Sequence, residues 1–199
     1  MQPGRCHWNL CRCCGHHPDG VAEKKDQTMK GFVQVYTGDG KGKTTAAIGL
    51  AVRAAGAGLK VYLAQFMKLG HYSETTALAR FSDLITVEQF GLGRFIQGKP
   101  SAGEIAAAQK GLEKVKTVLA GGEHKLVILD EANVAVMTGL FSARDLLELI
   151  AAKPEDTELV LTGRGAPDEI IEAADLVTEM KAVRHYYSKG VQARVGIEK

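Results

Sequence analysis

The stretch VYTGDGKGKTTAAI, residues 35–48, constrains the fold of this chain more than any other segment. A short β-rich run, GFVQVY, precedes its glycines, and an Ala-rich helical run follows them over residues 43–55. Its end, residues 42–44, matches the phosphate-binding pattern G-x-x-x-x-G-K-[ST], although Thr37 stands where the first glycine is usual. A glycine loop between a strand and a helix predicts a parallel α/β domain with a phosphate-binding site.

The residue types of this loop suit a phosphate ligand. Glycines let the backbone approach closely and direct successive N–H groups toward an anion, and the helix N-terminus adds a favourable dipole. Lys43 and Lys41 supply positive charge, and the Thr44 hydroxyl is a ligand for Mg²⁺. An ordinary glycine turn is the alternative, but Gly-Lys-Thr-Thr in this position favours phosphate binding.

Strand-like and helix-like segments alternate from Met29 onward, which predicts one α/β domain over residues 29–199. Such alternation implies a mostly parallel sheet with helices on both faces. The capping box SAGE at 101–104 predicts a helix that Gly121 and Gly122 end. Its apolar face would contain Ile105, Ala108, Leu112, Val115 and Leu119. Further helices are expected at 73–81, at about 142–152 and from Pro167; strands are expected at 31–36, 60–66, 84–90, 125–131, 158–164, 175–180 and 193–197.

Charged residues follow two of these strands. Asp130 and Glu131 end the nearly all-apolar strand KLVILDE, at the sheet edge where ligands of open α/β folds lie. Carboxylates there can hold Mg²⁺ directly or through water. Arg164 follows the strand ELVLTGR and would face the same crevice, where it could hold phosphate or ribose oxygens. A helix cap for the acidic pair and a surface turn for Arg164 are the structural alternatives.

Two more loops at this edge are candidates for a second substrate. Gln65 and Lys68 follow the second strand, and GLGRF (91–95) follows the third. His71 is more typical of a surface histidine than of a ligand, and Phe90 of packing.

Composition narrows the function classes. The formal net charge of the 199-residue chain is +2, which gives no electrostatic reason to expect nucleic acid as a partner. No apolar run is long enough for a transmembrane helix, and no secretory signal is recognisable. The four cysteines all lie within residues 6–14, so a disulfide framework for the domain is excluded and a cytoplasmic location is expected.

Residues 1–28 differ from the remainder of the chain. They are rich in Cys, His, Gly and Pro and have neither helical nor strand periodicity. A disordered extension is the favoured interpretation, with Met29 as an alternative start. A metal site is the other interpretation, but the spacing C-x₄-C-x-C-C lacks the paired C-x₂-C knuckles of zinc sites.

These motifs together resemble the P-loop type of ATP:corrinoid adenosyltransferase, also called cob(I)yrinic acid a,c-diamide adenosyltransferase. The resemblance covers essentially all of residues 29–199. It rests on VYTGDGKGKTTAAIGLAVRAAG (35–56), VYLAQFMKLG (61–70), LVILDEAN (126–133), LTGRGAPDEIIEAADLVTEM (161–180) and GVQARVGIE (190–198). The family's own loop has the form T-G-x-G-K-G-K-T-T, so Thr37 is normal for it.

The resemblance implies a RecA-like P-loop NTPase fold and adenosyl transfer from ATP to the Co(I) centre of a corrinoid, in biosynthesis or salvage. It further implies Mg²⁺, a flavodoxin-type electron donor and a homodimer. Lys43 and Glu131 would be catalytic; Thr44, Glu131 and Asp130 would hold the metal; Gln65, Lys68, Arg94 and Phe95 would contact the corrinoid. ATP would contact Thr37, Gly38, Asp39, Gly40, Lys41, Gly42, Lys43, Thr44, Thr45 and Arg164.

One element departs from the family pattern. The aromatic G-F-x-W element of better-known members is replaced here by GLGRFI (91–96), which has Phe95 but no tryptophan. The alternative function is a P-loop ATPase or GTPase that acts as a switch. That class needs a water-positioning residue and usually an arginine finger, a role for which Arg164 is the candidate.

Overall fold

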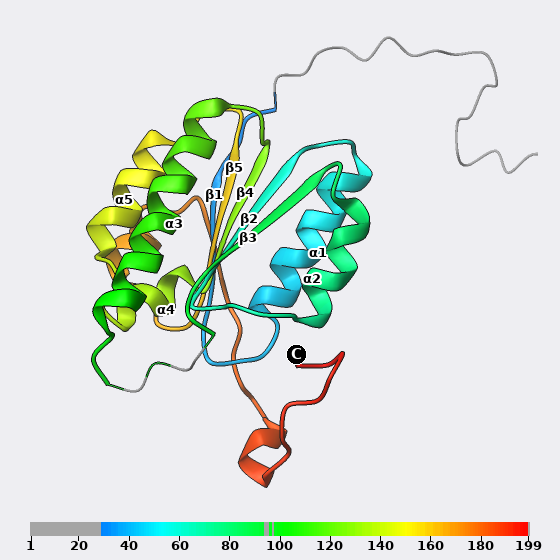
Figure 1. Ribbon diagram of the computed structural model, residues 1–199, viewed down its shortest axis with the longest axis vertical. Helices are drawn as coiled ribbons and strands as arrows, with labels where there is room; N and C mark the ends of the chain where they lie inside the picture. The colour runs from blue at the N-terminus through cyan, green and yellow to red at the C-terminus, as the bar shows by residue number, and fades with distance from the viewer. Residues whose placement is uncertain (1–28, 94–95, 97, 199) are drawn as a thin grey trace, which may run out of the picture.

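The computed structural model describes residues 29–93, 96 and 98–198, so the predictions for residues 1–28, Arg94 and Phe95 lie outside it. One parallel sheet of six strands, in the order β3-β2-β4-β5-β1-β6, forms the centre of the domain (Figure 1). The strands are β1 (Val33–Thr37), β2 (Val61–Phe66), β3 (Ile85–Phe90), β4 (Leu126–Asp130), β5 (Glu158–Thr162) and β6 (Leu176–Glu179).

Helices cover both faces of this sheet. In Figure 1, α1 and α2 lie on one face and α3, α4 and α5 on the other. This arrangement confirms the predicted fold class, a mostly parallel sheet with helices on both faces. The helices are α1 (Lys43–Gly56), α2 (Ser73–Leu78), α3 (Ala102–Gly121), α4 (Ala132–Met137), α5 (Ala143–Ala152) and α6 (Asp168–Glu172), with 3₁₀ turns at Ala79–Phe81 and Tyr186–Lys189.

The alternation of side chains along β4 divides the core into two clusters. Val127 and Leu129 pack with residues of α3 and α5, whereas Leu126 and Ile128 pack with the alanines of α1. All five residues of β4 are buried, as expected for a central parallel strand covered on both faces. The sheet is therefore held rigidly between two helical layers, and its carboxyl edge is a fixed platform for the loops.

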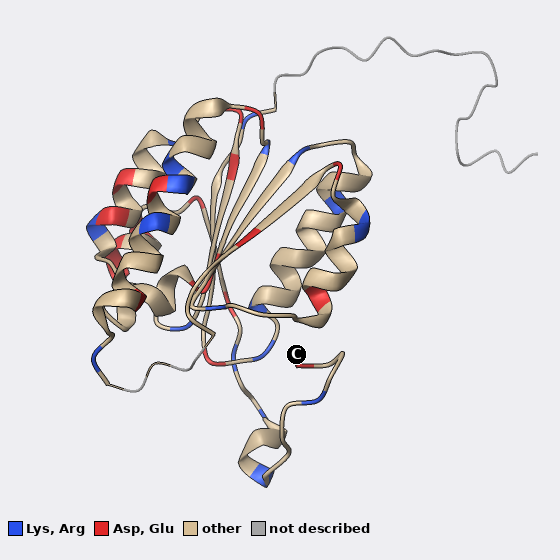
Figure 2. Ribbon diagram, viewed as in Figure 1, with Lys and Arg blue, Asp and Glu red and all other residues tan. Residues whose placement is uncertain are grey.

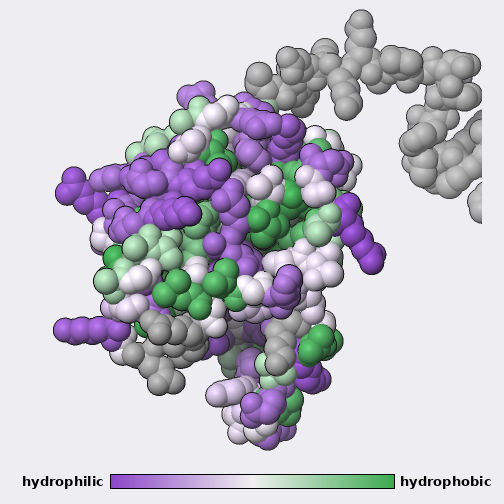
Figure 3. Space-filling view, viewed as in Figure 1, coloured by the Kyte–Doolittle hydropathy of each residue, from purple (hydrophilic) through white to green (hydrophobic). Residues whose placement is uncertain are grey.

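The surface over α3 and α5 is largely polar. Figure 2 shows acidic and basic residues intermixed on α3 and α5, and Figure 3 shows the corresponding part of the surface as mainly hydrophilic. Among the described residues, no helix is both long and apolar enough to cross a membrane.

The C-terminal strand prediction was wrong. Residues 193–197 form no strand; a turn covers residues 195–198, and the segment lies outside the sheet. The Glu198 N–H donates to the Arg194 carbonyl at 2.9 Å, and the Arg194 guanidinium pairs with the Glu198 carboxylate at 3.0 Å. These local bonds close the backbone on itself, so it is not available for a strand ladder.

Smaller differences concern the helices. The segment expected at 73–81 divides into α2 and a 3₁₀ turn, and Pro167 is the N-cap of α6, not its first residue. Ile105 was expected on the apolar face of α3 but is 37% exposed, whereas the other four expected positions are buried. The short helix α4 was not predicted, because it begins directly after β4 without an intervening loop.

Gly111 is a test of packing between α3 and the sheet. A Cβ at this position would lie 2.7 Å from the ring of Phe90 and 2.8 Å from that of Phe66. Overpacking of this kind costs about 1–3 kcal/mol, which offsets the gain of about 1 kcal/mol in helix propensity. Gly111→Ala should therefore lower the free energy of unfolding in urea by about 1 kcal/mol.

Gly121→Ala, in the same helix, is the matched control. A Cβ at Gly121 would meet no described atom within 4 Å, so this variant should gain helix propensity without a clash. Equal stability of the two variants would contradict the close contact between α3 and the two rings.

Candidate active site

The glycine loop after β1 closes around a lysine. Lys43, the first residue of α1, is only 8% exposed. Its ammonium donates hydrogen bonds to the carbonyl oxygens of Gly38 at 2.6 Å and Gly40 at 2.7 Å. Burial lowers the pKa of Lys43, and nearby Arg164 lowers it further. The loop thus presents a partly desolvated cation at a helix N-terminus, which is a favourable position for an anion.

Close backbone contacts explain two of the glycines. The Gly40 N–H donates to the Met180 carbonyl, just past β6, at 2.6 Å. A Cβ at Gly38 would lie 2.5 Å from that carbonyl oxygen, and one at Gly40 would lie 2.6 Å from it. The exit of β6 therefore lies against the loop, and side chains at positions 38 and 40 would push the two apart.

Asp130, at the end of β4, is the centre of a buried hydrogen-bond network. The hydroxyls of Thr44 and Thr162 each donate to its Oδ1 at 2.8 Å. Lys68 Nζ donates to Oδ2 at 2.9 Å, and Gln65 Nε2 donates to the same oxygen at 3.3 Å. The carboxylate is fully buried, and these four donors use the acceptor sites that a carboxylate normally offers.

The adjacent Glu131 has a different environment. Its backbone has a left-handed φ of 62°, and its N–H donates to Thr162 Oγ1 at 3.0 Å. Its side chain lines the cavity, and among the described residues its carboxylate has no hydrogen-bond partner. Burial raises the pKa of Glu131, as does the charge of Asp130, while Lys68 opposes both. Glu131 is thus the carboxylate of this pair with oxygens free for a metal.

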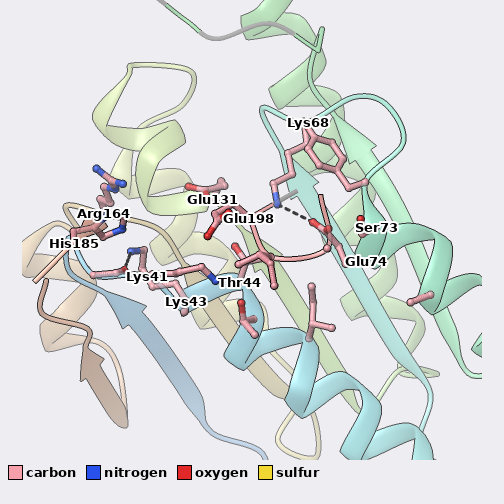
Figure 4. A pocket seen from close by; sticks show the side chains of 18 residues that line it. Lys41, Lys43, Thr44, Lys68, Ser73, Glu74, Glu131, Arg164, His185 and Glu198 are labelled. Carbon is pink, nitrogen blue, oxygen red and sulfur yellow. Dashed lines mark hydrogen bonds and ion pairs between the residues drawn. The ribbon is translucent and has the colours of Figure 1, made fainter. Parts of the chain in front are cut away.

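A cavity of about 810 Å³ opens above the glycine loop and α1 (Figure 4). Its size suits a nucleotide. Figure 4 shows Thr44 and Glu131 close to the lysines of the loop, with Arg164 beside them. The lining residues are Gly40, Lys41, Gly42, Lys43, Thr44, Thr45, Ile48, Lys68, Tyr72, Ser73, Glu74, Ala77, Glu131, Arg164, His185, Gly196, Ile197 and Glu198.

The structure thus brings most of the predicted nucleotide residues to one cavity. Thr37, Gly38 and Asp39 do not line it; the Thr37 hydroxyl accepts a hydrogen bond from the Ala166 N–H at 3.2 Å. Phe90 is a core residue, as expected.

Gln65 and Lys68, the predicted corrinoid contacts on β2 and after it, both donate hydrogen bonds to Asp130. Gln65 is fully buried behind the cavity, because its side chain points toward Asp130 instead of outward. Lys68 lines the cavity, but its ammonium is also within 3.5 Å of the Glu74 carboxylate. Although burial lowers the pKa of Lys68, the charges of Asp130 and Glu74 outweigh it and raise the pKa.

Sequence reasoning missed two contributions to this site. Thr162 was not singled out, although parallel pairing of β4 with β5 sets Leu161 beside Leu129 and so Thr162 beside Asp130. The C-terminal wall of the cavity, which includes His185 and Glu198, was also missed. Glu198 is held there by the Tyr186 hydroxyl and by Arg194, through side-chain contacts that hydrophobic periodicity does not signal.

Comparison with known proteins gives the family of this chain. Residues 29–198 match the family model described as ATP:corrinoid adenosyltransferase BtuR/CobO/CobP. The corrinoid adenosyltransferase of Pseudomonas aeruginosa is 35% identical, with 89% of this chain and 87% of that protein covered. That of Escherichia coli K12 is 34% identical, with 89% of both chains covered, and CobA of Salmonella typhimurium is 31% identical, with 86% and 87% covered. The chain therefore belongs to the CobA/CobO/BtuR family of ATP:corrinoid adenosyltransferases.

Proposed function

We propose that the cavity above the glycine loop binds ATP with its triphosphate on residues 40–45, as in a P-loop, and that the 5′-deoxyadenosyl group is transferred from there to Co(I) of a corrinoid. The observation that supports this most is the loop wrapped around Lys43 at the start of α1. Lys41, Lys68 and Arg164 line the same cavity. This concentration of positive charge suits a triphosphate, which is the leaving group of the reaction.

We further propose that Mg²⁺ binds between Thr44 and Glu131. Mg²⁺ in nucleotide sites is usually held by one or two carboxylates together with phosphate oxygens and water. The residues fit this pattern, because Thr44 and Glu131 line the same cavity and the Glu131 carboxylate has no hydrogen-bond partner among the described residues. When bound, Mg²⁺ would neutralise part of the triphosphate charge.

Asp130 has a supporting role in this proposal. Its four hydrogen bonds leave it no free oxygen for a metal. By accepting a hydrogen bond from the Thr44 hydroxyl, however, it leaves the Thr44 lone pairs free to face the cavity. Outer partners of this kind fix metal ligands in position.

The chemical step needs little from the protein beyond alignment and charge. Co(I) is a strong nucleophile, so no general base is required. A bond forms between cobalt and C5′ of ATP while the C5′–O bond breaks, and the electron pair leaves with the triphosphate. Lys43 and the loop N–H groups would stabilise that leaving group in place, and the rigid sheet edge would hold C5′ in position for attack.

An ATP analogue with an imido group between the β and γ phosphates separates this function from a switch-type hydrolase. Adenosyl transfer breaks only the C5′–O bond, so the analogue should still convert chemically reduced corrinoid to the light-sensitive adenosyl product and release imidotriphosphate. Hydrolysis of the γ-phosphate would instead be blocked. Turnover with ATP but none with the analogue, despite equal binding, would contradict the proposed reaction.

The identity of the partners is a separate proposal. On the resemblance alone, we propose that the enzyme acts as a homodimer and receives its electrons from a flavodoxin-type donor. Light scattering of the full chain tests the first point. Replacement of chemical reductant by a reduced flavodoxin, with adenosylcorrinoid as the product measured, tests the second.

A further inference from the structure

A row of side chains connects Asp130 to the edge of the sheet. In the parallel register, Gln65 of β2 lies between Asp130 of β4 and Gln89 of β3. Gln65 Nε2 donates to Asp130 Oδ2 at 3.3 Å, and Gln89 Nε2 donates to Gln65 Oε1 at 3.0 Å. Gln89 Oε1 then accepts from the Gly70 N–H at 2.9 Å. We call Gln65 and Gln89 the glutamine row.

The direction of this row is fixed at both ends. A carboxylate only accepts hydrogen bonds, so Gln65 must turn its NH₂ group toward Asp130 and its oxygen toward Gln89. A backbone N–H only donates, so Gln89 must turn its oxygen toward Gly70 and its NH₂ group toward Gln65. Both requirements give the same orientation, and reversing either amide would set acceptor against acceptor or donor against donor.

The row ends at the loop of residues 67–72, which forms one wall of the cavity. Lys68 and Tyr72 of this loop line the cavity directly. The loop is therefore tied to Asp130 twice, through the ammonium of Lys68 and through the glutamine row from Gly70. Met67 has a left-handed φ of 61°, an uncommon conformation for methionine that surrounding contacts must hold.

The exit of β3 packs against the same loop. A Cβ at Gly91 would lie 2.5 Å from the carbonyl carbon of Met67 and 2.6 Å from the Lys68 nitrogen. The loop of residues 67–72 thus lies between the nucleotide cavity and the segment that follows β3. A shift of this loop would change both the shape of the cavity and the position of the segment that follows β3.

We propose that Gln65 and Gln89 are positioning residues for adenosyl transfer. They hold the loop of residues 67–72 in a fixed relation to Asp130, and Asp130 in turn orients Thr44. Neither glutamine lines the cavity, so neither touches ATP there. Their effect is on the alignment of the reacting groups, and the inference rests on the proposed adenosyl transfer at this site.

Two variants at Gln89 test the direction of the row. Gln89 is only partly buried and lies on an edge strand, so the fold should tolerate both. Gln89→Met keeps the length of the side chain but removes both hydrogen bonds. Gln89→Glu keeps the acceptor for Gly70 but turns a second acceptor toward the oxygen of Gln65. If the direction of the hydrogen bonds in the row matters, Gln89→Glu is more damaging than Gln89→Met, although glutamate resembles glutamine more closely than methionine does.

The measurement is kcat and KM for ATP and for pre-reduced corrinoid, together with the melting temperature of each variant. We expect Gln89→Met to lower kcat about tenfold, the effect of one buried acceptor left unpaired, and Gln89→Glu to lower it further. KM for ATP should stay within about twofold, because the glycine loop is not disturbed. Gln109→Glu on the exposed side of α3 adds the same charge without contact to the row and should match the wild type.

The outcomes separate a failure of the proposed positioning role from a failure of the proposed reaction. A wild-type enzyme that forms no adenosylcorrinoid would overturn the proposed function. A wild-type enzyme that forms it, with kcat unchanged in both folded Gln89 variants or lowered equally by them, would overturn the positioning role alone. A loss confined to KM for ATP would also overturn it, since the row would then act on nucleotide binding.

Discussion

Lys43→Ala is expected to lower kcat/KM for adenosyl transfer by about a hundredfold or more. The loss of one preorganised charge at a developing anion costs on the order of 3 kcal/mol. The structure adds a second reason, because the Lys43 ammonium also joins the Gly38 and Gly40 carbonyls and so shapes the loop. The assay is the formation of adenosylcorrinoid from chemically reduced corrinoid, at several concentrations of ATP and saturating Mg²⁺.

Lys60→Ala is the matched control for this variant. Lys60 precedes β2 at the opposite end of the sheet and forms an exposed ion pair with Glu123. Exposed pairs contribute little, so activity and folding should match the wild type. If a folded Lys43→Ala protein has the same kcat/KM as the control, the glycine loop is not part of the active site.

Glu131→Gln is expected to raise the Mg²⁺ concentration for half-maximal activity by about ten- to hundredfold. Losing only a side chain that hydrogen-bonds to a metal ligand lowers metal affinity by about ten- to hundredfold. In Glu131→Gln the charged oxygen of the proposed ligand itself is lost. Because Asp130 has no free acceptor, it offers no substitute. The measurement is a Mg²⁺ titration of activity at fixed ATP, with circular dichroism to confirm that the protein is folded.

Glu113→Gln controls for the loss of one negative charge. Glu113 is exposed on α3 and pairs only locally with Lys116 among the described residues. Its Mg²⁺ dependence should equal that of the wild type. If Glu131→Gln also has the wild-type dependence, Glu131 serves as the N-cap of α4 and not as a metal ligand.

The parts of the site predicted from sequence are those with local signals. The residues of the glycine loop are contiguous in the short connection between β1 and α1. Asp130 is the last residue of β4 and Glu131 follows it, and the other residues of this strand are all apolar. In parallel α/β folds such strand ends converge on one edge, so local patterns were enough to place these groups together.

The parts that were not predicted depend on side-chain contacts that hydrophobic periodicity does not signal. The role of Gln65 follows from its position between two particular strands, which strand order determines and local sequence does not. A turn at residues 195–198 replaced the strand expected at 193–197 because Arg194 and Glu198 bond to each other. Glu198 lines the cavity because the C-terminal segment folds back toward the glycine loop, and no local pattern in the sequence predicts that path.

The most direct test of the account is the phosphorus balance of a single reaction. Protein, ATP, Mg²⁺ and chemically reduced corrinoid are mixed, and the phosphorus products are followed by ³¹P NMR while the adenosylcorrinoid is quantified by absorbance before and after light. The account predicts one intact triphosphate for each adenosylcorrinoid, with no product at all when corrinoid is omitted. Formation of ADP and inorganic phosphate at the same rate with and without corrinoid would contradict it.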